Sequence, residues 1–432
     1  MADEARIVQY RLGDVFVVGR PPTVTYSPRE PKKLETILAD YLEERGRVLI
    51  VTGPSKSGKT VLLSRAIPDA IWVAGGNVDN VDRFWRRVVD DTDSYTTELL
   101  EESTSGTETE TDTDEAGFMP AGVGAKKTWV DTRIEGTGTR RTQEADRDVQ
   151  SVGRDALLTA DRPLIVDDFH HIAPDVQREL VRHLKPLIDR NVAVIFAAVP
   201  HHAADVVAAE GEMEGRVENL QIGLWEVEEL TDIADRGYRA ALRVRCSEEL
   251  AISLAEYSLR SPHLMQLLCR ELAKVNDIRE TAEDDRTRVE PPDDWETFLR
   301  QVAERHTHDG TLRTLAHGPQ SGSDRIPREL QRGGETDIYG AILEAIAATG
   351  PQEQLHYTDL REALRGVLRT IPQKHEVTAC LRHMTNIAKE LARDEWGRLN
   401  RDPVLEYIAG NDTLYIADPF FAFRLRWGPA PS

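Results

Sequence analysis

The chain has 432 residues, of which 40% are hydrophobic, so it is long enough for two to four domains with sizeable cores. Its 75 acidic residues outnumber 54 basic ones, and the formal net charge of −21 excludes a surface that attracts nucleic acid or anionic lipid everywhere. Three scattered cysteines exclude a disulfide framework, and no apolar run approaches the ~18 residues of a membrane span. We expect a soluble, cytoplasmic protein without membrane contact, because the N-terminal residues also lack the apolar stretch of a signal peptide.

Strand and helix patterns alternate from residue 34 onward. Apolar spacing predicts an amphipathic helix over 34–45, and the continuous apolar run 47–52 predicts a strand covered on both faces. Further strands are predicted at 70–74, 163–168 and 191–199, and further helices at 60–66, 81–89 and from Pro174. This alternation is typical of an α/β fold with a parallel sheet.

Composition changes between residues 91 and 154. The segment 103–115 is acidic, rich in hydroxyl groups and nearly free of apolar side chains. Such a segment cannot bury enough surface to offset the entropy lost on ordering. We therefore expect 91–154 to be an acidic, mobile insertion in the α/β core.

The second half of the chain reads as helical, then mixed. Residues 226–275 show helical patterns and no strand, whereas 279–295 and 310–335 are rich in charge, proline, glycine or serine. Three helical stripes and two short extended runs follow from residue 337, which is the outline of a winged helix. The expected parts are an N-terminal lead (1–46), an α/β core (47–225), a helical lid (226–278), a linker (279–335) and a winged-helix domain (336–432).

The segment from Gly53 to Thr60 is a complete Walker A sequence placed between a predicted strand and a predicted helix. Its glycines let successive backbone N–H groups turn toward phosphates, and the helix that follows adds its positive N-terminus. Lys59 would contact the β- and γ-phosphates of ATP, and the Thr60 hydroxyl would bind Mg²⁺. A plain surface turn is the alternative, but it would not explain the strand and helix on either side. The candidate nucleotide-binding residues here are Gly53, Pro54, Ser55, Lys56, Ser57, Gly58, Lys59 and Thr60.

An apolar strand ending in Asp167 and Asp168 is typical of a Walker B sequence. Asp167 would hold the metal ion through water, and Asp168 would orient or deprotonate the attacking water. An aspartate pair at a strand end can also be a solvated turn. The Walker A sequence upstream favours the catalytic interpretation.

With these motifs the chain resembles the AAA+ and STAND ATPases, particularly their origin-recognition-like branch. The resemblance implies that Arg29 and Glu30 belong to a segment closing over the adenine, and that Arg216 is an arginine finger reaching a neighbouring subunit. It also implies a lid contact with nucleotide from Pro262 and His263. The C-terminal residues 416–427 are similar to the end of winged-helix domains in this group.

The chain departs from that family at three positions. The second Walker B acid is Asp168 where AAA+ motors usually carry glutamate, and the shorter side chain implies slow hydrolysis. His201 stands after the strand where a polar sensor is usual, and His263 stands where an arginine is usual, so either can be a plain histidine. Arg216 can also be a surface arginine paired with a nearby acid.

Two further groups of residues invite a binding role. His170 and His171 suggest a metal, but adjacent residues on a strand point apart, so we expect no zinc site there. The third helix of the winged-helix candidate carries basic residues interleaved with acids, which leaves both DNA contact and protein docking open. These basic residues are Lys374, His375, Arg382, His383, Lys389 and Arg393.

The leading functional hypothesis is a nucleotide-dependent switch or assembly ATPase. ATP and Mg²⁺ would bind between core and lid, a homo-oligomer would form with nucleotide bound, and the winged helix would pass the state to duplex DNA or a protein partner. One alternative is a DNA-binding initiator, transposition or regulatory protein in which ATP stabilises an oligomer. The other is a nucleotide-binding scaffold without turnover.

Overall fold

The structure of the protein is a computed structural model. It describes residues 8–94, 97–104, 127–132, 139–146, 148–202, 215–283, 286–306, 309–318, 325–350 and 352–428. Among these residues, no helix combines the length and the apolar character needed to cross a lipid bilayer.

A five-stranded parallel sheet forms the core, in the order β2-β6-β7-β1-β8. Its strands are β1 (Val48–Thr52), β2 (Ile71–Ala74), β6 (Leu164–Asp167), β7 (Val194–Ala198) and β8 (Val217–Gln221). Because all strands are parallel, their carboxyl ends meet at one edge, where ligands bind in open α/β sheets. The predicted parallel α/β core is confirmed, and it has an edge strand, β8, that the sequence pattern did not predict.

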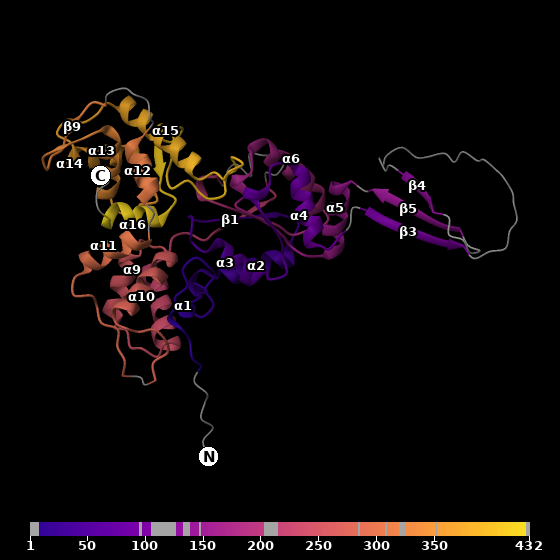
Figure 1. The fold of residues 1–432 in the computed structure, drawn as a ribbon, viewed down its shortest axis with the longest axis horizontal. Helices are drawn as coiled ribbons and strands as arrows, with labels where there is room; N and C mark the ends of the chain where they lie inside the picture. The colour runs from indigo at the N-terminus through magenta and orange to yellow at the C-terminus, as the bar shows by residue number, and fades with distance from the viewer. Residues whose placement is uncertain are drawn as a thin grey trace, which may run out of the picture.

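Helices cover both faces of this sheet, which explains the continuous apolar strands. Leu49 and Val51 of β1 pack against α2 (Leu34–Glu44) and α3 (Lys59–Ala66), which lie beneath β1 in Figure 1. Val48 and Ile50 face the opposite layer. That layer contains α4 (Val81–Asp91), α5 (Val149–Ala160) and α6 (Pro174–Ile188).

Three strands lie within the segment expected to be a mobile insertion. β3 (Thr97–Thr104), β5 (Thr139–Asp146) and β4 (Lys127–Thr132) form an antiparallel sheet in that order, and Figure 1 shows it projecting away from α4 and α5. Backbone hydrogen bonds alone build such a ladder, so a polar sequence does not exclude it. Residues 105–126 and 133–138 lie outside the described part, and so does the expectation of mobility for them.

The predicted lid is helical. It comprises α8 (Val227–Ala234), the π-helical segment η6 (Asp235–Ala241), α9 (Glu248–Tyr257) and α10 (Pro262–Val275), which share a core with the short N-terminal helix α1 (Leu12–Val15). The linker expected at 279–335 is wrong in part, because α11 (Trp295–His306) and α12 (Asp309–His317) occupy it. Phe298, Leu299 and Val302 of α11 are buried in the lid core.

The remaining residues form a C-terminal unit, the name used here for the described residues from 338 to 428. The predicted helices are present as α13 (Ile338–Ala348), α14 (Tyr357–Val367) and α15 (Lys374–Leu391). The predicted ribbon is a three-stranded antiparallel sheet, in the order β11 (Gln354–His356), β13 (Thr413–Tyr415) and β12 (Glu406–Ile408). A two-residue ladder, β9 (Arg328–Glu329) with β10 (Glu335–Thr336), precedes it.

The last helix, α16 (Pro419–Trp427), joins the C-terminal unit to the lid. Phe421 is buried in the core of the C-terminal unit, whereas Phe423 is buried in the lid core. Because one short helix contributes to both cores, the C-terminal unit is held over the lid and beside the P-loop (Figure 1).

Candidate nucleotide-binding site

The Walker A segment curls tightly between β1 and α3. Lys56 and Gly58 have positive φ angles of 60° and 98°, which turns the backbone around the loop. A Cβ on Gly53 would lie 2.8 Å from Ser57 Oγ and 3.2 Å from Ile222 Cβ, so the loop needs a glycine there. This geometry aims backbone N–H groups and the start of α3 at a common point, which suits a phosphate.

Lys59 is folded back onto its own loop. Its Nζ donates hydrogen bonds to the carbonyl oxygens of Gly53 at 2.8 Å and Pro54 at 2.9 Å, and the residue is only 6% exposed. Burial lowers the pKa of Lys59, although the nearby carboxylates of Asp402, Asp168 and others oppose that shift. A phosphate at this site would have to attract the ammonium group away from these two carbonyls.

The two predicted metal-binding side chains lie together. Thr60 Oγ1 donates to Asp167 Oδ2 at 2.7 Å, and Asp167 is buried at the carboxyl end of β6. A hydroxyl and a carboxylate at this edge are oxygen ligands of the kind that Mg²⁺ accepts beside nucleotide phosphates. These residues therefore fit the ion that the Walker motifs imply.

Asp168 follows in a left-handed conformation with φ of 50°. Burial, reinforced by the charge of Asp167, raises its pKa to about 6. A Cβ on Gly75, in η2 (Gly75–Asn77), would lie 2.3 Å from the carbonyl oxygen of Asp168, so only glycine allows this approach. Asp168 is thus packed against Gly75, the first residue after β2, at the carboxyl edge of the sheet.

A cavity of about 280 Å³ lies beside the P-loop. It is bounded by the N-terminal lead, the loop and the start of α10, and Arg29, Pro262 and His263 are among the residues that line it. Glu30, in η1 (Glu30–Lys32), is not among them. The cavity has room for the base and sugar of a nucleotide whose phosphates occupy the loop.

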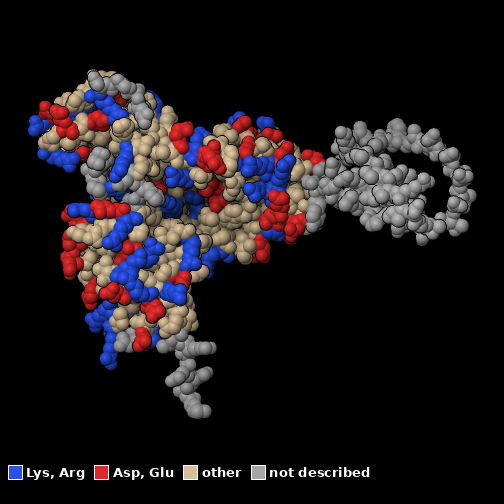
Figure 2. Space-filling model, viewed as in Figure 1, with Lys and Arg blue, Asp and Glu red and all other residues tan. Residues whose placement is uncertain are grey.

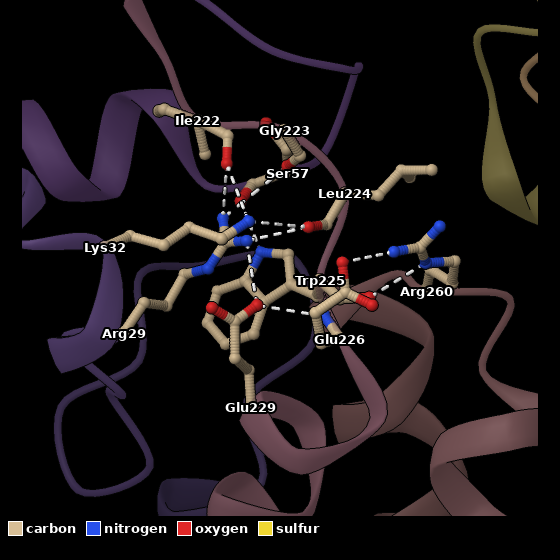
Figure 3. Close-up of polar contacts among 10 residues, drawn as sticks. All are labelled: Arg29, Lys32, Ser57, Ile222, Gly223, Leu224, Trp225, Glu226, Glu229 and Arg260. Atoms are coloured by element: carbon tan, nitrogen blue, oxygen red, sulfur yellow. Dashed lines mark hydrogen bonds and ion pairs between the residues drawn. The ribbon is translucent and has the colours of Figure 1, made fainter.

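Arg29 is tied into the protein by its own guanidinium. It donates to the carbonyl oxygens of Ile222 at 2.9 Å and Leu224 at 2.7 Å, and it pairs with Glu229 at 2.8 Å (Figure 3). Arg29 is 3% exposed, and its guanidinium carbon lies 4.7 Å from the centre of the Trp225 ring. The residue therefore shapes the cavity by fixing the segment that follows β8.

Trp225 connects that segment to the P-loop. Its Nε1 donates to the carbonyl oxygen of Ser57 at 2.9 Å, and its own carbonyl oxygen accepts from Arg260 Nε at 3.0 Å (Figure 3). Arg260 also pairs with Glu226. No sequence motif indicated a role for Trp225, which lies four residues beyond the end of β8.

The C-terminal unit contacts the P-loop directly. Asp418 Oδ2 lies 2.8 Å from Lys56 Nζ, which also lies 4.5 Å from the centre of the Phe420 ring. A narrow space of about 40 Å³ separates residues 54–57 from Glu353 and residues 416–417. Nothing in the sequence motifs indicated this contact, which joins residues more than 350 positions apart.

Two more carboxylates of the C-terminal unit act on the loop. Burial raises the pKa of Glu353 to about 7, while the charges of Arg260 and Lys59 oppose the rise. Asp402 accepts a hydrogen bond from the Ser55 side chain, and its negative charge favours the charged form of Lys59. The P-loop thus faces three acids, Glu353, Asp402 and Asp418, where a triphosphate would bring further negative charge.

The remaining predicted residues lie apart from this site or are engaged elsewhere. Arg216 precedes β8 at the amino end of the sheet, opposite the P-loop, and its Nη1 pairs with Asp189. Pairing with an acid was one of the two alternatives for this residue. His201, in η4 (Pro200–His202), lies 3.3 Å from Glu406 and stacks on Tyr415 at 4.3 Å.

The expectation that His170 and His171 point apart is wrong. They lie in a 3₁₀ turn, η3 (Phe169–His171), and not on a strand, so both rings face one way. The Nε2 atoms of His170 and His171 lie 2.7 Å and 3.0 Å from the same oxygen, Oδ1 of Asp402. Burial lowers the pKa of His170 to about 4.

No protein-family model matches the chain, and no curated protein matches it. Among solved structures, it is similar to Cdc6p from Pyrobaculum aerophilum, with a TM-score of 0.42, 13% identity, and coverage of 96% of this chain and 97% of that one. Aeropyrum pernix Orc1 in complex with DNA gives a TM-score of 0.43 at 12% identity, with 96% of each chain covered.

A STAND protein from Pyrococcus horikoshii with a tetratricopeptide repeat sensor is also similar, with a TM-score of 0.35 and 12% identity. The match covers 94% of this chain but only 44% of that protein. Because these TM-scores are low, the fold class rests on the strand order and on the loop between β1 and α3. The chain has the α/β P-loop core that its sequence predicts.

Proposed function

We propose that this protein is an ATP-binding, slowly hydrolysing switch whose C-terminal unit responds to the occupancy of the P-loop. The observation that supports it most is the set of three carboxylates, from Glu353, Asp402 and Asp418, directed at the loop. In this arrangement Lys56 pairs with Asp418, and Lys59 bonds its own loop. Both lysines are thus engaged by groups that a triphosphate would have to replace.

Electrostatics gives the direction of the response. Like charges brought within a few ångströms in a partly buried site repel by several kcal/mol at an effective dielectric of about 20. Phosphate oxygens in the loop would therefore compete with Asp418 for Lys56 and disfavour the nearby charge of Glu353. ATP binding would weaken the contact between the C-terminal unit and the core, and tight docking would weaken ATP binding in return.

The remaining roles follow from the site geometry. Thr60 and Asp167 would hold Mg²⁺, which would bridge and neutralise phosphate oxygens. Asp168 would orient the attacking water, and its short side chain favours slow turnover. Arg216 lies at the far end of the sheet from its own loop, so it could serve only a neighbouring subunit's site, in a nucleotide-dependent homo-oligomer.

The test compares ATP affinity between the wild type and two variants. Asp418→Asn keeps the side-chain cap on the amide of Phe420 but loses the charge, so it should bind ATP up to about fivefold more tightly, the effect of an ion pair of about 1 kcal/mol. Lys59→Ala should weaken binding at least about tenfold, since a charge-assisted phosphate contact contributes about 1.5–3 kcal/mol. The control is Glu344→Gln in α13 of the C-terminal unit, which removes an ion pair with Arg332. Unchanged affinity in Lys59→Ala, or weaker binding in Asp418→Asn, would contradict the proposal.

The two alternatives receive separate measurements. A DNA-binding protein needs basic residues that can turn to phosphates, but Lys374 and Lys389 of α15, and Arg393 just beyond its end, pair with Asp412, Glu406 and Glu390. Figure 2 shows acidic and basic side chains interspersed over the core and lid on the face drawn. Duplex affinity measured against salt concentration tests this alternative, and a steep negative slope would support it. A scaffold without turnover would release phosphate no faster than its own Asp168→Asn variant.

A further inference from the structure

We propose that His170, His171 and Asp402 form a binding site for a divalent transition metal of the zinc class, at the junction between the core and the C-terminal unit. This inference does not rest on the proposed function. Two of the residues come from the core turn that follows the Walker B strand, and the third comes from the loop that precedes β12. Figure 1 shows this yellow loop reaching across to the core.

The three ligand atoms already lie near the separation that a metal ion requires. The two imidazole Nε2 atoms are 2.7 Å and 3.0 Å from Asp402 Oδ1, and all three atoms lie within 4.8 Å of one another. Around a tetrahedral zinc with bonds of about 2.0–2.1 Å, neighbouring ligand atoms are about 3.3 Å apart. To admit the ion, the two nitrogen–oxygen separations would widen by a few tenths of an ångström, from 2.7 Å and 3.0 Å to about 3.3 Å.

The two histidines are held rigidly in this orientation. Their side chains are 5% and 2% exposed, and the ring centres lie 4.4 Å apart. Gln177 Nε2 donates to the carbonyl oxygens of Phe169 and Ile172, each at 3.0 Å, and so fixes both ends of the turn. Preorganised ligands lose little conformational entropy on binding, which favours affinity.

The ligand types select the metal. Imidazole nitrogens suit Zn²⁺ and its first-row neighbours, whereas Mg²⁺ prefers an all-oxygen set such as Thr60 with Asp167. A cavity of about 750 Å³ borders His170, His171 and Asp402, so it provides an entry path and water for the fourth coordination position. His170 Nδ1 is buried without a hydrogen-bond partner in the described part of the chain, whereas Nε2 donates to the Asp402 carboxylate, so Nε2 carries the proton without metal and would give it up to bind the ion.

A second trio beside the first serves as a contrast. His201, His202 and Glu406 also bring their ligand atoms within 4.8 Å of one another. However, Lys389 Nζ lies 2.5 Å from Glu406 Oε1, so a cation already pairs with that carboxylate. The ammonium group would repel a metal ion, and the proposed site is therefore the trio around Asp402.

The position of the site gives it a consequence. A metal ion bound there would link the turn after Asp168 to the C-terminal unit, because the two histidines come from the turn and Asp402 comes from the C-terminal unit. Asp402 also accepts a hydrogen bond from Ser55 of the P-loop. Zinc binding should therefore raise the melting temperature of the protein in which the C-terminal unit is docked on the core.

The test uses the full chain, stripped with a chelator and then titrated with Zn²⁺ in competition with a chromophoric chelator. We expect about one zinc per chain, an increase in melting temperature with zinc, and affinity lowered at least about 100-fold in His171→Ala and in Asp402→Asn, since loss of an outer-shell partner alone costs up to that much. Circular dichroism of each variant without metal checks that it folds. The His170→Ala variant gives the same measurement should Asp402→Asn fail to fold.

Two controls separate this site from other histidines. His375→Ala removes an exposed imidazole on α15 and should leave zinc affinity unchanged. The double variant His201→Ala/His202→Ala should keep affinity within a few-fold. Absence of stoichiometric zinc in the wild type, full affinity in His171→Ala, or complete loss in the double variant would each overturn the proposal.

Discussion

Replacing Glu353 by glutamine should stabilise this protein at neutral and alkaline pH but not in acid. Burial raises the pKa of Glu353 to about 7 from its ordinary value of 4.5, and the attraction of Arg260 and Lys59 does not cancel that effect. The folded protein therefore holds the proton to a higher pH than the unfolded chain does. As a result, wild-type stability falls as pH rises from about 4.5 to about 7, and the deficit persists above that range.

The size of the effect follows from the pKa difference. One pKa unit corresponds to about 1.36 kcal/mol, so the rise from 4.5 to about 7 costs the wild type about 3 kcal/mol above pH 7. Glutamine has nearly the same shape and no charge. It should remove most of this cost, because the pKa difference already includes the attraction of Arg260 and Lys59.

Urea unfolding at pH 5 and pH 8 measures the difference. The midpoint for Glu353→Gln should exceed that of the wild type clearly at pH 8 and only slightly at pH 5, with similar slopes. Glu362→Gln is a matched control in the same unit, because that side chain is 69% exposed and pairs with Arg365. Its effect should stay within about 0.5 kcal/mol at both pH values. Equal stabilisation at the two pH values, or destabilisation at pH 8, would refute the reasoning.

Three further substitutions probe the site. Arg29→Met should lower the free energy of unfolding by about 3–5 kcal/mol, because it leaves the Glu229 carboxylate buried without its partner. Denaturant melts measure this loss, and a loss below about 1 kcal/mol would contradict the role of Arg29 as a buried anchor. Gly75→Ala should lower the free energy of unfolding by about 1–3 kcal/mol, since its Cβ would lie 2.3 Å from the Asp168 carbonyl oxygen. A thermal melt measures this, and an unchanged melting temperature would show that the turn accepts a Cβ without strain. Trp225→Phe should lower the free energy of unfolding by about 1–3 kcal/mol, because it leaves the Ser57 carbonyl oxygen of the P-loop unpaired, and it should weaken ATP binding. Equilibrium binding measures the second effect, and unchanged affinity would show that the indole does not support the site.

Much of the core was predictable because its strands are covered on both faces. A strand such as 47–52 has apolar residues at successive positions, and no partner need be known to recognise it. β8 was not predicted because it is an edge strand in which only Leu220 is buried, so it lacks a continuous apolar run. The two helices within the expected linker, at 295–306 and 309–317, were not predicted because charged residues surround their short apolar stripes. The stripe of α11 packs on the lid, and Leu312 and Leu315 of α12 pack in the core of the C-terminal unit.

The candidate site divides in the same way. The Walker residues could be identified because phosphate binding needs a fixed local spacing of glycine, lysine and hydroxyl along one turn. The roles of Arg29 as an anchor and Trp225 as a link could not, because their partners come from other segments. His170 and His171 were misjudged because a 3₁₀ turn and a strand orient adjacent side chains differently.

The sequence alone determined the local chemistry: a loop that can cradle phosphate, a carboxylate at a strand end, and helical stripes that each need a buried face. Only the tertiary structure decided which distant groups meet that chemistry. Glu353, Asp402 and Asp418 reach the P-loop because α16 contributes to two cores at once and brings the C-terminal unit over it. Spacing along the chain specifies elements, whereas contacts across some 350 residues depend on how those elements pack.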